Sequence, residues 1–104
     1  MSNVYIVQDS PGKNFIPAEK FGEAKYLLVG RQSSLAVPVI RKLRRELRNF
    51  TDEDYLLLVG DPVAIGVATA LAARQNRGRV KVLKWDRQES CYYVVQIDLD
   101  GGET

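Results

Sequence analysis

Apolar runs alternate with turn-forming residues along the whole chain. Val4–Val7 is a short β-rich run that ends at the turn-forming residues 9–12. Tyr26–Val29 and Tyr55–Gly60 are continuous apolar runs that each end at a glycine, a pattern typical of parallel strands covered on both faces. We therefore predict three strands in these positions. Residues 13–23 have an irregular pattern, which predicts a loop with one turn of helix.

Two segments between these runs have helical patterns. From Ala36 to Asn49 an apolar stripe recurs at steps of three and four, which predicts a helix. Asp61 followed by Pro62 marks the start of a second helix, because Asp caps helices well and Pro suits their first position. The second helix is expected to end at Gln75, to be mostly buried because of its many small residues, and to pack closely on the sheet at Gly66.

The carboxyl-terminal part has the pattern of a β-hairpin. Arg79–Trp85 and Tyr92–Leu99 are β-rich runs joined by the polar residues 86–90. The whole order of elements predicts an α/β fold with a small Rossmann-like or flavodoxin-like sheet of about five strands. Two helices do not cover both faces of such a sheet, so either one face is exposed or another chain covers it. We expect a homodimer.

Length and composition limit the class of protein. A chain of 104 residues and 11.7 kDa, 45% hydrophobic, fits a single domain over 1–104, with residues 100–104 expected to be frayed. Its longest apolar run, Val63–Ala73, is shorter than the roughly 20 residues of a membrane-spanning helix. The amino terminus has no signal-peptide pattern, and Cys91 is the only cysteine. We therefore expect a cytoplasmic protein that does not enter a membrane.

The absence of histidine removes many kinds of chemistry. Without histidine and with one cysteine, the common zinc sites and the Ser/His/Asp and Cys/His triads are excluded. Cys91 has no histidine to activate it and is expected to be a small buried strand residue. We predict no catalytic residues, no metal site and no cofactor, which favours a binding protein over an enzyme.

Charge is patterned although the net charge is only +2. One basic group lies on the predicted first helix, with Glu46 as its only acid; its members are Arg41, Lys42, Arg44, Arg45 and Arg48. A second group extends from Arg74 to Arg87 and ends in the hairpin, where Lys84, Trp85 and Arg87 combine basic and aromatic side chains. Such groups suit nucleic acid or an acidic protein surface. A solvated helix face and core packing of Trp85 are the plain structural alternatives.

The two predicted turns from strand to helix are candidate phosphate sites, because the start of a helix presents free N–H groups. The first turn has one glycine, an arginine and two hydroxyls, at Gly30, Arg31, Ser33 and Ser34. The second has Asp61, whose carboxylate competes for the same donors, and it lacks the further residues of a P-loop. Helix capping is the plain structural alternative to phosphate binding at both turns.

One resemblance covers most of the chain. Residues 54–66, with their Gly60, Asp61 and Pro62, together with 76–80 and 83–87, are similar to a pattern in small proteins of bacteriophages and prophages; 12–15 and 41–47 extend the similarity. The resemblance implies the host-cell cytoplasm and action on host or phage machinery, but no activity and no functional residues.

Three functional hypotheses remain open at this stage. The first is a non-enzymatic, phage-type binding or regulatory module that contacts nucleic acid or an acidic host or phage protein through the basic helix and the hairpin. The second is a small nucleotide- or phosphate-binding protein that uses Arg31, Ser33, Ser34 and Asp61. The third is a virion or assembly component that oligomerises.

Overall fold

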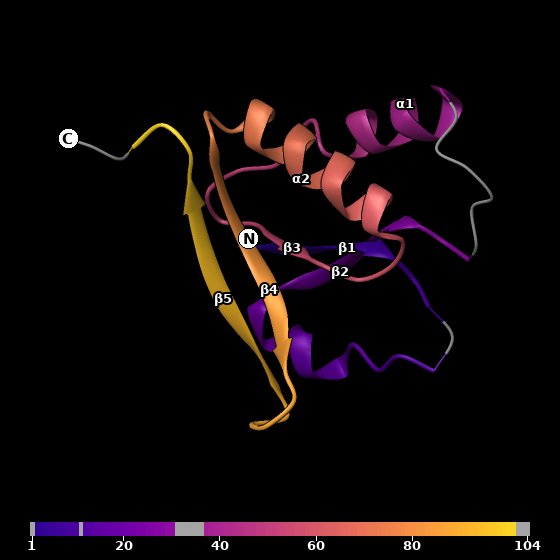
Figure 1. Cartoon of the computed structure of the whole chain (residues 1–104), viewed down its shortest axis with the longest axis vertical. Helices are drawn as coiled ribbons and strands as arrows, with labels where there is room; N and C mark the ends of the chain where they lie inside the picture. The colour runs from indigo at the N-terminus through magenta and orange to yellow at the C-terminus, as the bar shows by residue number, and fades with distance from the viewer. Residues whose placement is uncertain (1, 11, 31–36, 102–104) are drawn as a thin grey trace.

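The computed structural model describes residues 2–10, 12–30 and 37–101 and contains one five-stranded sheet, in the order β2-β1-β3-β4-β5 (Figure 1). The first four strands are parallel, and β4 and β5 form an antiparallel hairpin. This is the flavodoxin-like strand order with an antiparallel last strand, so the predicted fold class is confirmed. The strands are β1 Asn3–Gln8, β2 Glu23–Leu28, β3 Tyr55–Leu57, β4 Arg79–Asp86 and β5 Cys91–Asp98.

The connections between parallel strands lie on opposite sides of the sheet. The 3-10 helix η1, Ile16–Phe21, connects β1 to β2, whereas α1, Val37–Glu46, and α2, Pro62–Gln75, follow β2 and β3. The β1-to-β2 connection runs one way along the sheet and the later two run the other way. Because such crossovers are right-handed, the first must lie on one face and the others on the opposite face. Figure 1 shows this arrangement, and we call the two sides the helix face and the η1 face.

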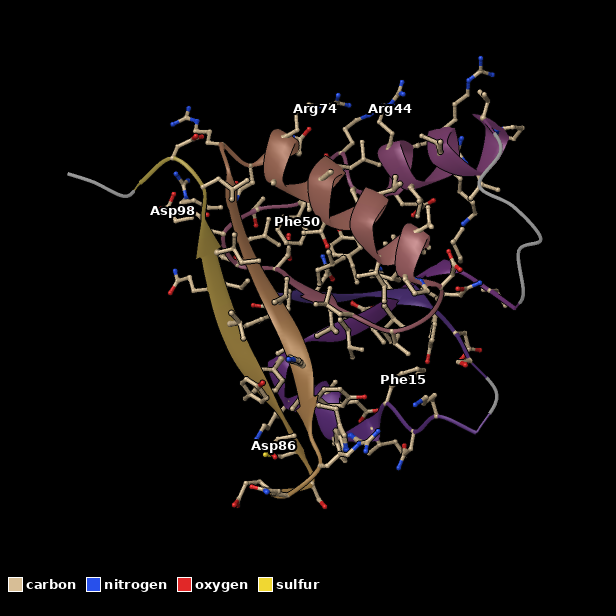
Figure 2. All side chains as sticks on the ribbon, in the orientation of Figure 1. Phe15, Arg44, Phe50, Arg74, Asp86 and Asp98 are labelled. Atoms are coloured by element: carbon tan, nitrogen blue, oxygen red, sulfur yellow. The ribbon has the colours of Figure 1, made fainter. Side chains whose placement is uncertain are left out.

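Side chains of the same strands divide between these faces. Along β1, Tyr5 and Val7 pack on the helix face while Val4 and Ile6 pack on the η1 face, as strand alternation requires. Figure 2 shows Phe50 between the helices and the sheet, with Phe15 on the other side of the sheet.

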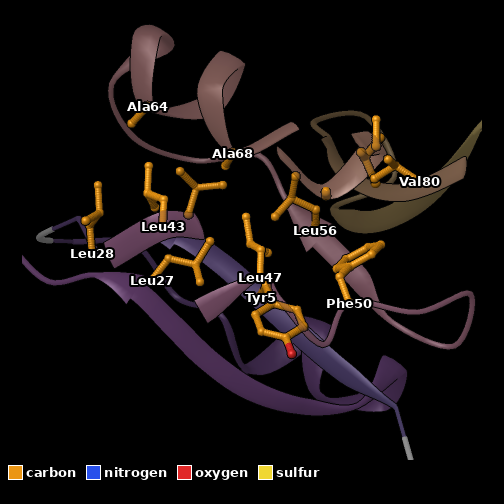
Figure 3. Close-up of a cluster of buried hydrophobic side chains, with 14 residues drawn as sticks. Tyr5, Leu27, Leu28, Leu43, Leu47, Phe50, Leu56, Ala64, Ala68 and Val80 are labelled. Atoms are coloured by element: carbon orange, nitrogen blue, oxygen red, sulfur yellow. The ribbon is translucent and has the colours of Figure 1, made fainter. Parts of the chain in front are cut away.

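The larger core fills the helix face (Figure 3). Leu43 from α1, Leu47 from the turn after it, and Ala64 and Ala68 from α2 pack on Leu56 and its neighbours in the sheet. The small side chains of α2 let this helix lie close to the sheet, and the two leucines fill the remaining space. On the η1 face a smaller cluster forms around Phe15, Ala18, Leu57 and Leu83.

Several details differ from the sequence prediction. The second strand begins at Glu23 and is an edge strand with Tyr26 and Val29 exposed, so it is not covered on both faces. The first helix ends at Glu46 and continues as a turn through residues 47–49; Ala36 lies outside the described residues. A Cβ added at Gly66 would meet nothing within 4 Å, so this glycine faces solvent and does not mediate close packing.

The second helix is also less buried than predicted. Its buried side chains come from one face, at Ala64, Ala68, Ala72 and Ala73, while Val63 and Ala70 are exposed. None of the helices among the described residues is long and apolar enough to cross a membrane.

Candidate functional site

The carboxyl ends of β1 and β3 form the point where strand order reverses, which is the usual ligand site in open α/β sheets. Here the side chain of Gln8, which is 8% exposed, occupies that point. Gln8 Oε1 accepts the backbone N–H of Asp61 (2.8 Å), and Gln8 Nε2 donates to the carbonyl of Gly30 (2.9 Å). This one side chain therefore ties together the segments that follow β2 and β3.

Gly60 makes this arrangement possible. Its φ of +116° is in a region that favours glycine, and a Cβ added there would lie 2.5 Å from Cβ of Gln8. Gly60 thus lets the chain pass directly over the Gln8 side chain.

Asp61 caps α2 as the sequence predicts. Its Oδ2 accepts the backbone N–H groups of Val63 (3.0 Å) and Ala64 (3.1 Å), so the donors a phosphate would use are already engaged. The other members of the predicted phosphate site, Arg31, Ser33 and Ser34, lie outside the described residues.

The predicted basic helix is α1, and its basic side chains have two different roles. Lys42 is half-buried and donates from Nζ to the carbonyl of Leu27 (2.7 Å), which ties α1 to β2. Arg41, Arg44 and Arg45 of α1 are exposed, and so is Arg48 in the turn that continues the helix. Their spacing of three and four residues places them on one stripe, opposite the buried Leu43 and Leu47.

Arg74 of α2 adds to this stripe. The two helices lie side by side, and Arg44 and Arg74 line a small hollow of about 80 Å³ with Leu47, Leu71 and Gln75. Figure 2 shows both arginines directed away from the sheet. We call the five exposed arginines 41, 44, 45, 48 and 74 the basic ridge. Because Arg74 is distant in sequence, only the packing of α1 on α2 reveals it as a member.

The arginines of the basic ridge are not paired with acidic side chains of the described residues. Within the described part of the chain, none of their guanidinium groups makes a hydrogen bond or an ion pair. Arg44 and Arg45 lie in the last turn of α1, where positive charge interacts favourably with the helix dipole. The ridge is therefore a surface of positive charge held on two packed helices.

The second predicted basic group does not form one patch. Arg79 binds Asp52 with two hydrogen bonds of 3.0 Å, and Lys81 Nζ lies 4.3 Å from the ring centroid of Tyr55. Hydrogen bonds from Arg79 and Asn76 lower the pKa of Asp52, and the same Asp52 contact raises the pKa of Arg79. These charges are engaged within the molecule.

The hairpin residues lie at the opposite end of the molecule from the basic ridge (Figure 1). Trp85 packs edge-on against Tyr92 on the η1 face, with ring centroids 4.8 Å apart, while its neighbour Lys84 points to the other face. Arg87 is exposed in the turn. The predicted helix and hairpin surfaces are thus separate and do not form one continuous surface.

Beside Trp85 the η1 face is hollowed by a cavity of about 320 Å³ that sequence reasoning missed. Its walls are Gly12, Lys13, Asn14, Pro17, Leu57, Leu58, Val59, Trp85 and Tyr92. Burial raises the pKa of Tyr92, so its hydroxyl stays protonated at neutral pH. Among the described residues, the connection that lines this hollow is the one between β1 and β2, through Gly12, Lys13, Asn14 and Pro17.

No group of potential metal ligands occurs among the described residues. The family model described as Phage Pam3 gp32-like protein matches residues 2–99. The chain belongs to this family. The phage resemblance read from the sequence is thereby confirmed over nearly the whole chain. Neither a curated protein nor a solved structure matches it.

Proposed function

We propose that this member of the Phage Pam3 gp32-like family binds the phosphate backbone of duplex nucleic acid through the basic ridge, in the cytoplasm of the infected host. The observation that carries the proposal is the set of exposed, unpaired guanidinium groups on α1 and α2. Arginine and lysine side chains that neutralise phosphates supply most of the affinity of sequence-independent binding.

The composition of the ridge favours nucleic acid over an acidic protein. Stable protein interfaces are centred on apolar and aromatic anchors that become fully buried. Among the described residues, the exposed aromatic side chains are Tyr26, Trp85 and Tyr93, and all three lie on strands and none on the two helices. The basic ridge offers charge and hydrogen-bond donors without such an anchor.

The same absence of aromatic side chains favours a duplex over a single strand. Proteins that hold single strands stack bases on aromatic rings. A duplex presents its phosphates on the outside, where arginines on one helix stripe reach them without contacting bases. Binding is therefore expected to depend on salt and to be indifferent to base sequence.

The test is a fluorescence anisotropy titration with two duplex DNAs of unrelated sequence at several salt concentrations. The double variant Arg44→Glu/Arg74→Glu is expected to lose affinity about a hundredfold, because each charged hydrogen bond is worth roughly tenfold. Both side chains are exposed, so the fold is expected to remain, as circular dichroism would show.

Arg87→Glu is the matched control for the single variant Arg44→Glu, since each replaces one exposed arginine with glutamate and so makes the same charge change. It is expected to keep nearly full affinity. An equal loss in this control would mean that only net charge matters, and the ridge would not be the site. Binding to polyglutamate but not to DNA would overturn the proposal in favour of an acidic protein partner, and binding to neither would overturn it outright.

A further inference from the structure

The outer side of β5 is an open sheet edge. Among the described residues, β5 pairs with β4 alone. The N–H of Leu99 bonds to the carbonyl of Gly78 (2.9 Å), so the odd-numbered residues of β5 direct their backbone groups toward β4. The even-numbered residues Tyr92, Val94, Gln96 and Asp98 then direct their N–H and C=O groups outward.

The side chains along this edge do not protect it. Tyr93, Val94 and Val95 are 40%, 40% and 38% exposed, and the strand carries no charge from Cys91 to Ile97. It also contains no proline or glycine, and its β-branched and aromatic residues favour extended structure. A long, uncharged, apolar edge is a template for pairing with another strand.

The opposite edge of the sheet is protected in the usual way. β2 carries Glu23 and Lys25, whose side chains form an ion pair of 3.5 Å, in an exposed half-strand. Charges on an edge disfavour the approach of a second strand. The β2 edge is therefore protected by charge against pairing with another strand, and the β5 edge is not.

We propose that β5 pairs antiparallel with β5 of a second copy of this chain, centred on Val95. In this register outward-facing residues meet each other: Tyr92 lies opposite the Asp98 of the second copy, and Val94 lies opposite its Gln96. Val95 meets its own counterpart, and Tyr93 meets Ile97. From Tyr93 to Ile97 uncharged residues thus lie opposite uncharged residues, and the charged Asp98 lies opposite a tyrosine and not opposite a like charge.

The bounds of β5 favour a two-fold axis at Val95 over one at Val94. A two-fold centred on Val94 would place Asp98 opposite Ser90, which is in the hairpin turn with a φ of +53° and not in a strand. Centring on Val95 pairs the entire length from Tyr92 to Asp98. The five-stranded sheet then continues into that of the second copy. α1, which carries most of the basic ridge, packs against β2 at one edge of the sheet, and β5 is the opposite edge. Pairing through β5 therefore does not depend on nucleic-acid binding by the ridge.

The first experiment measures mass by sedimentation equilibrium at increasing protein concentration. The wild-type chain is expected at twice 11.7 kDa. Val95→Lys and Val95→Glu are each expected at the monomer mass, because two like charges would lie directly opposite each other. An equimolar mixture of the two variants is expected to recover the dimer, which a merely misfolded variant would not do.

Val63→Lys is the matched control, since Val63 is an exposed valine on α2. It is expected to remain a dimer. The proposal is overturned if the wild-type chain stays monomeric up to millimolar concentration, or if both Val95 variants remain dimeric. Failure of the mixed variants to associate would also overturn it.

A second experiment fixes the register. In a Cys91→Ser background, Val95→Cys places two thiols in a non-hydrogen-bonded pair, with Cα atoms about 4.5 Å apart, which suits a disulfide. Oxidation is expected to give a covalent dimer, whereas Val94→Cys in the same background is expected to stay uncrosslinked. Faster crosslinking of the Val94 variant would overturn the Val95 centre.

Discussion

The helix face and the η1 face of the sheet are made by the same strands but are covered by very different amounts of chain. Two α-helices, of ten and fourteen residues, pack on the first, and a 3-10 helix of six residues packs on the second. The handedness of the crossovers assigns each connection to a face, and its length then decides how well that face is covered. The cavity beside Trp85 belongs to the poorly covered side of this division.

Two neighbouring leucines of β3 test this difference directly. Leu56 points into the helix-face core and Leu57 into the η1-face core, and both are almost fully buried. Leu56→Ala is expected to lower the free energy of unfolding by about 4 kcal/mol, because two packed helices do not collapse into the space. Leu57→Ala is expected to lower it by about 2 to 3 kcal/mol, since Leu57 borders the open cavity, where neighbours relax more easily.

Urea denaturation of both variants measures the difference. The two substitutions remove the same atoms from adjacent positions of one strand, so each serves as the control for the other. An equal or larger loss for Leu57→Ala would show that the η1 face is packed as tightly as the helix face.

Much of this fold is readable from the sequence because its signals are local. The Asp61 cap, the end of α2 at Gln75 and the hairpin pattern each depend on a few consecutive residues. The exposure of β2 is not readable in this way, since the run from Tyr26 to Val29 is as apolar as a central strand. Its position depends on strand order, which follows from all the connections together.

The buried side chain of Gln8, at the point where strand order reverses, is expected to contribute less to stability than Leu56. Gln8 follows Val4 and Ile6 on the η1 side of β1 and holds the segments after β2 and β3. Gln8→Ala is expected to cost about 1 to 3 kcal/mol, because it leaves the N–H of Asp61 and the carbonyl of Gly30 without these partners.

Thermal or urea unfolding measures this cost, with Gln88→Ala in the exposed turn as the control, expected within about 0.5 kcal/mol of the wild type. If Gln8→Ala leaves the free energy of unfolding almost unchanged, water replaces the Gln8 side chain and its two hydrogen bonds do not stabilise the fold. The position would then be an accessible site at the strand ends.

The candidate site shows a similar limit of sequence reasoning. The stripe on α1 is visible as a helical repeat, but Lys42 within it is drawn inward to Leu27, and Arg74 joins from another helix. Charge counting does not separate these cases, because the identity of the partner depends on tertiary packing. Whether the helix and hairpin surfaces merge could not be predicted either, because it depends on strand order.

The smallest predicted effect concerns the exposed Asp52–Arg79 pair at the start of β4. The pKa of Asp52 is held below its ordinary value in the folded chain, so this carboxylate stabilises the fold above about pH 4. That contribution is lost as the pH falls through the lowered pKa. The stability difference between the wild type and Asp52→Ala is therefore expected to be small at neutral pH and to vanish in acid.

Unfolding curves at neutral and acidic pH, in low and high salt, measure this difference. Salt is expected to reduce it, because the pair is open to solvent. A difference that persists at a pH below both pKa values would show that Asp52 acts through packing and not through charge.

The position of Trp85 determines which part of the molecule its tryptophan fluorescence reports. It is the only tryptophan, it is 42% exposed, and it touches Tyr92 at the border of the cavity, far from the helix-face core. Its emission therefore reports the environment of the hairpin, and fraying of that hairpin would change the signal while the helices remain packed. Fluorescence thus follows the hairpin end, whereas far-ultraviolet circular dichroism follows the backbone of the whole chain, so coincidence of the two during unfolding would show that the hairpin unfolds cooperatively with the rest.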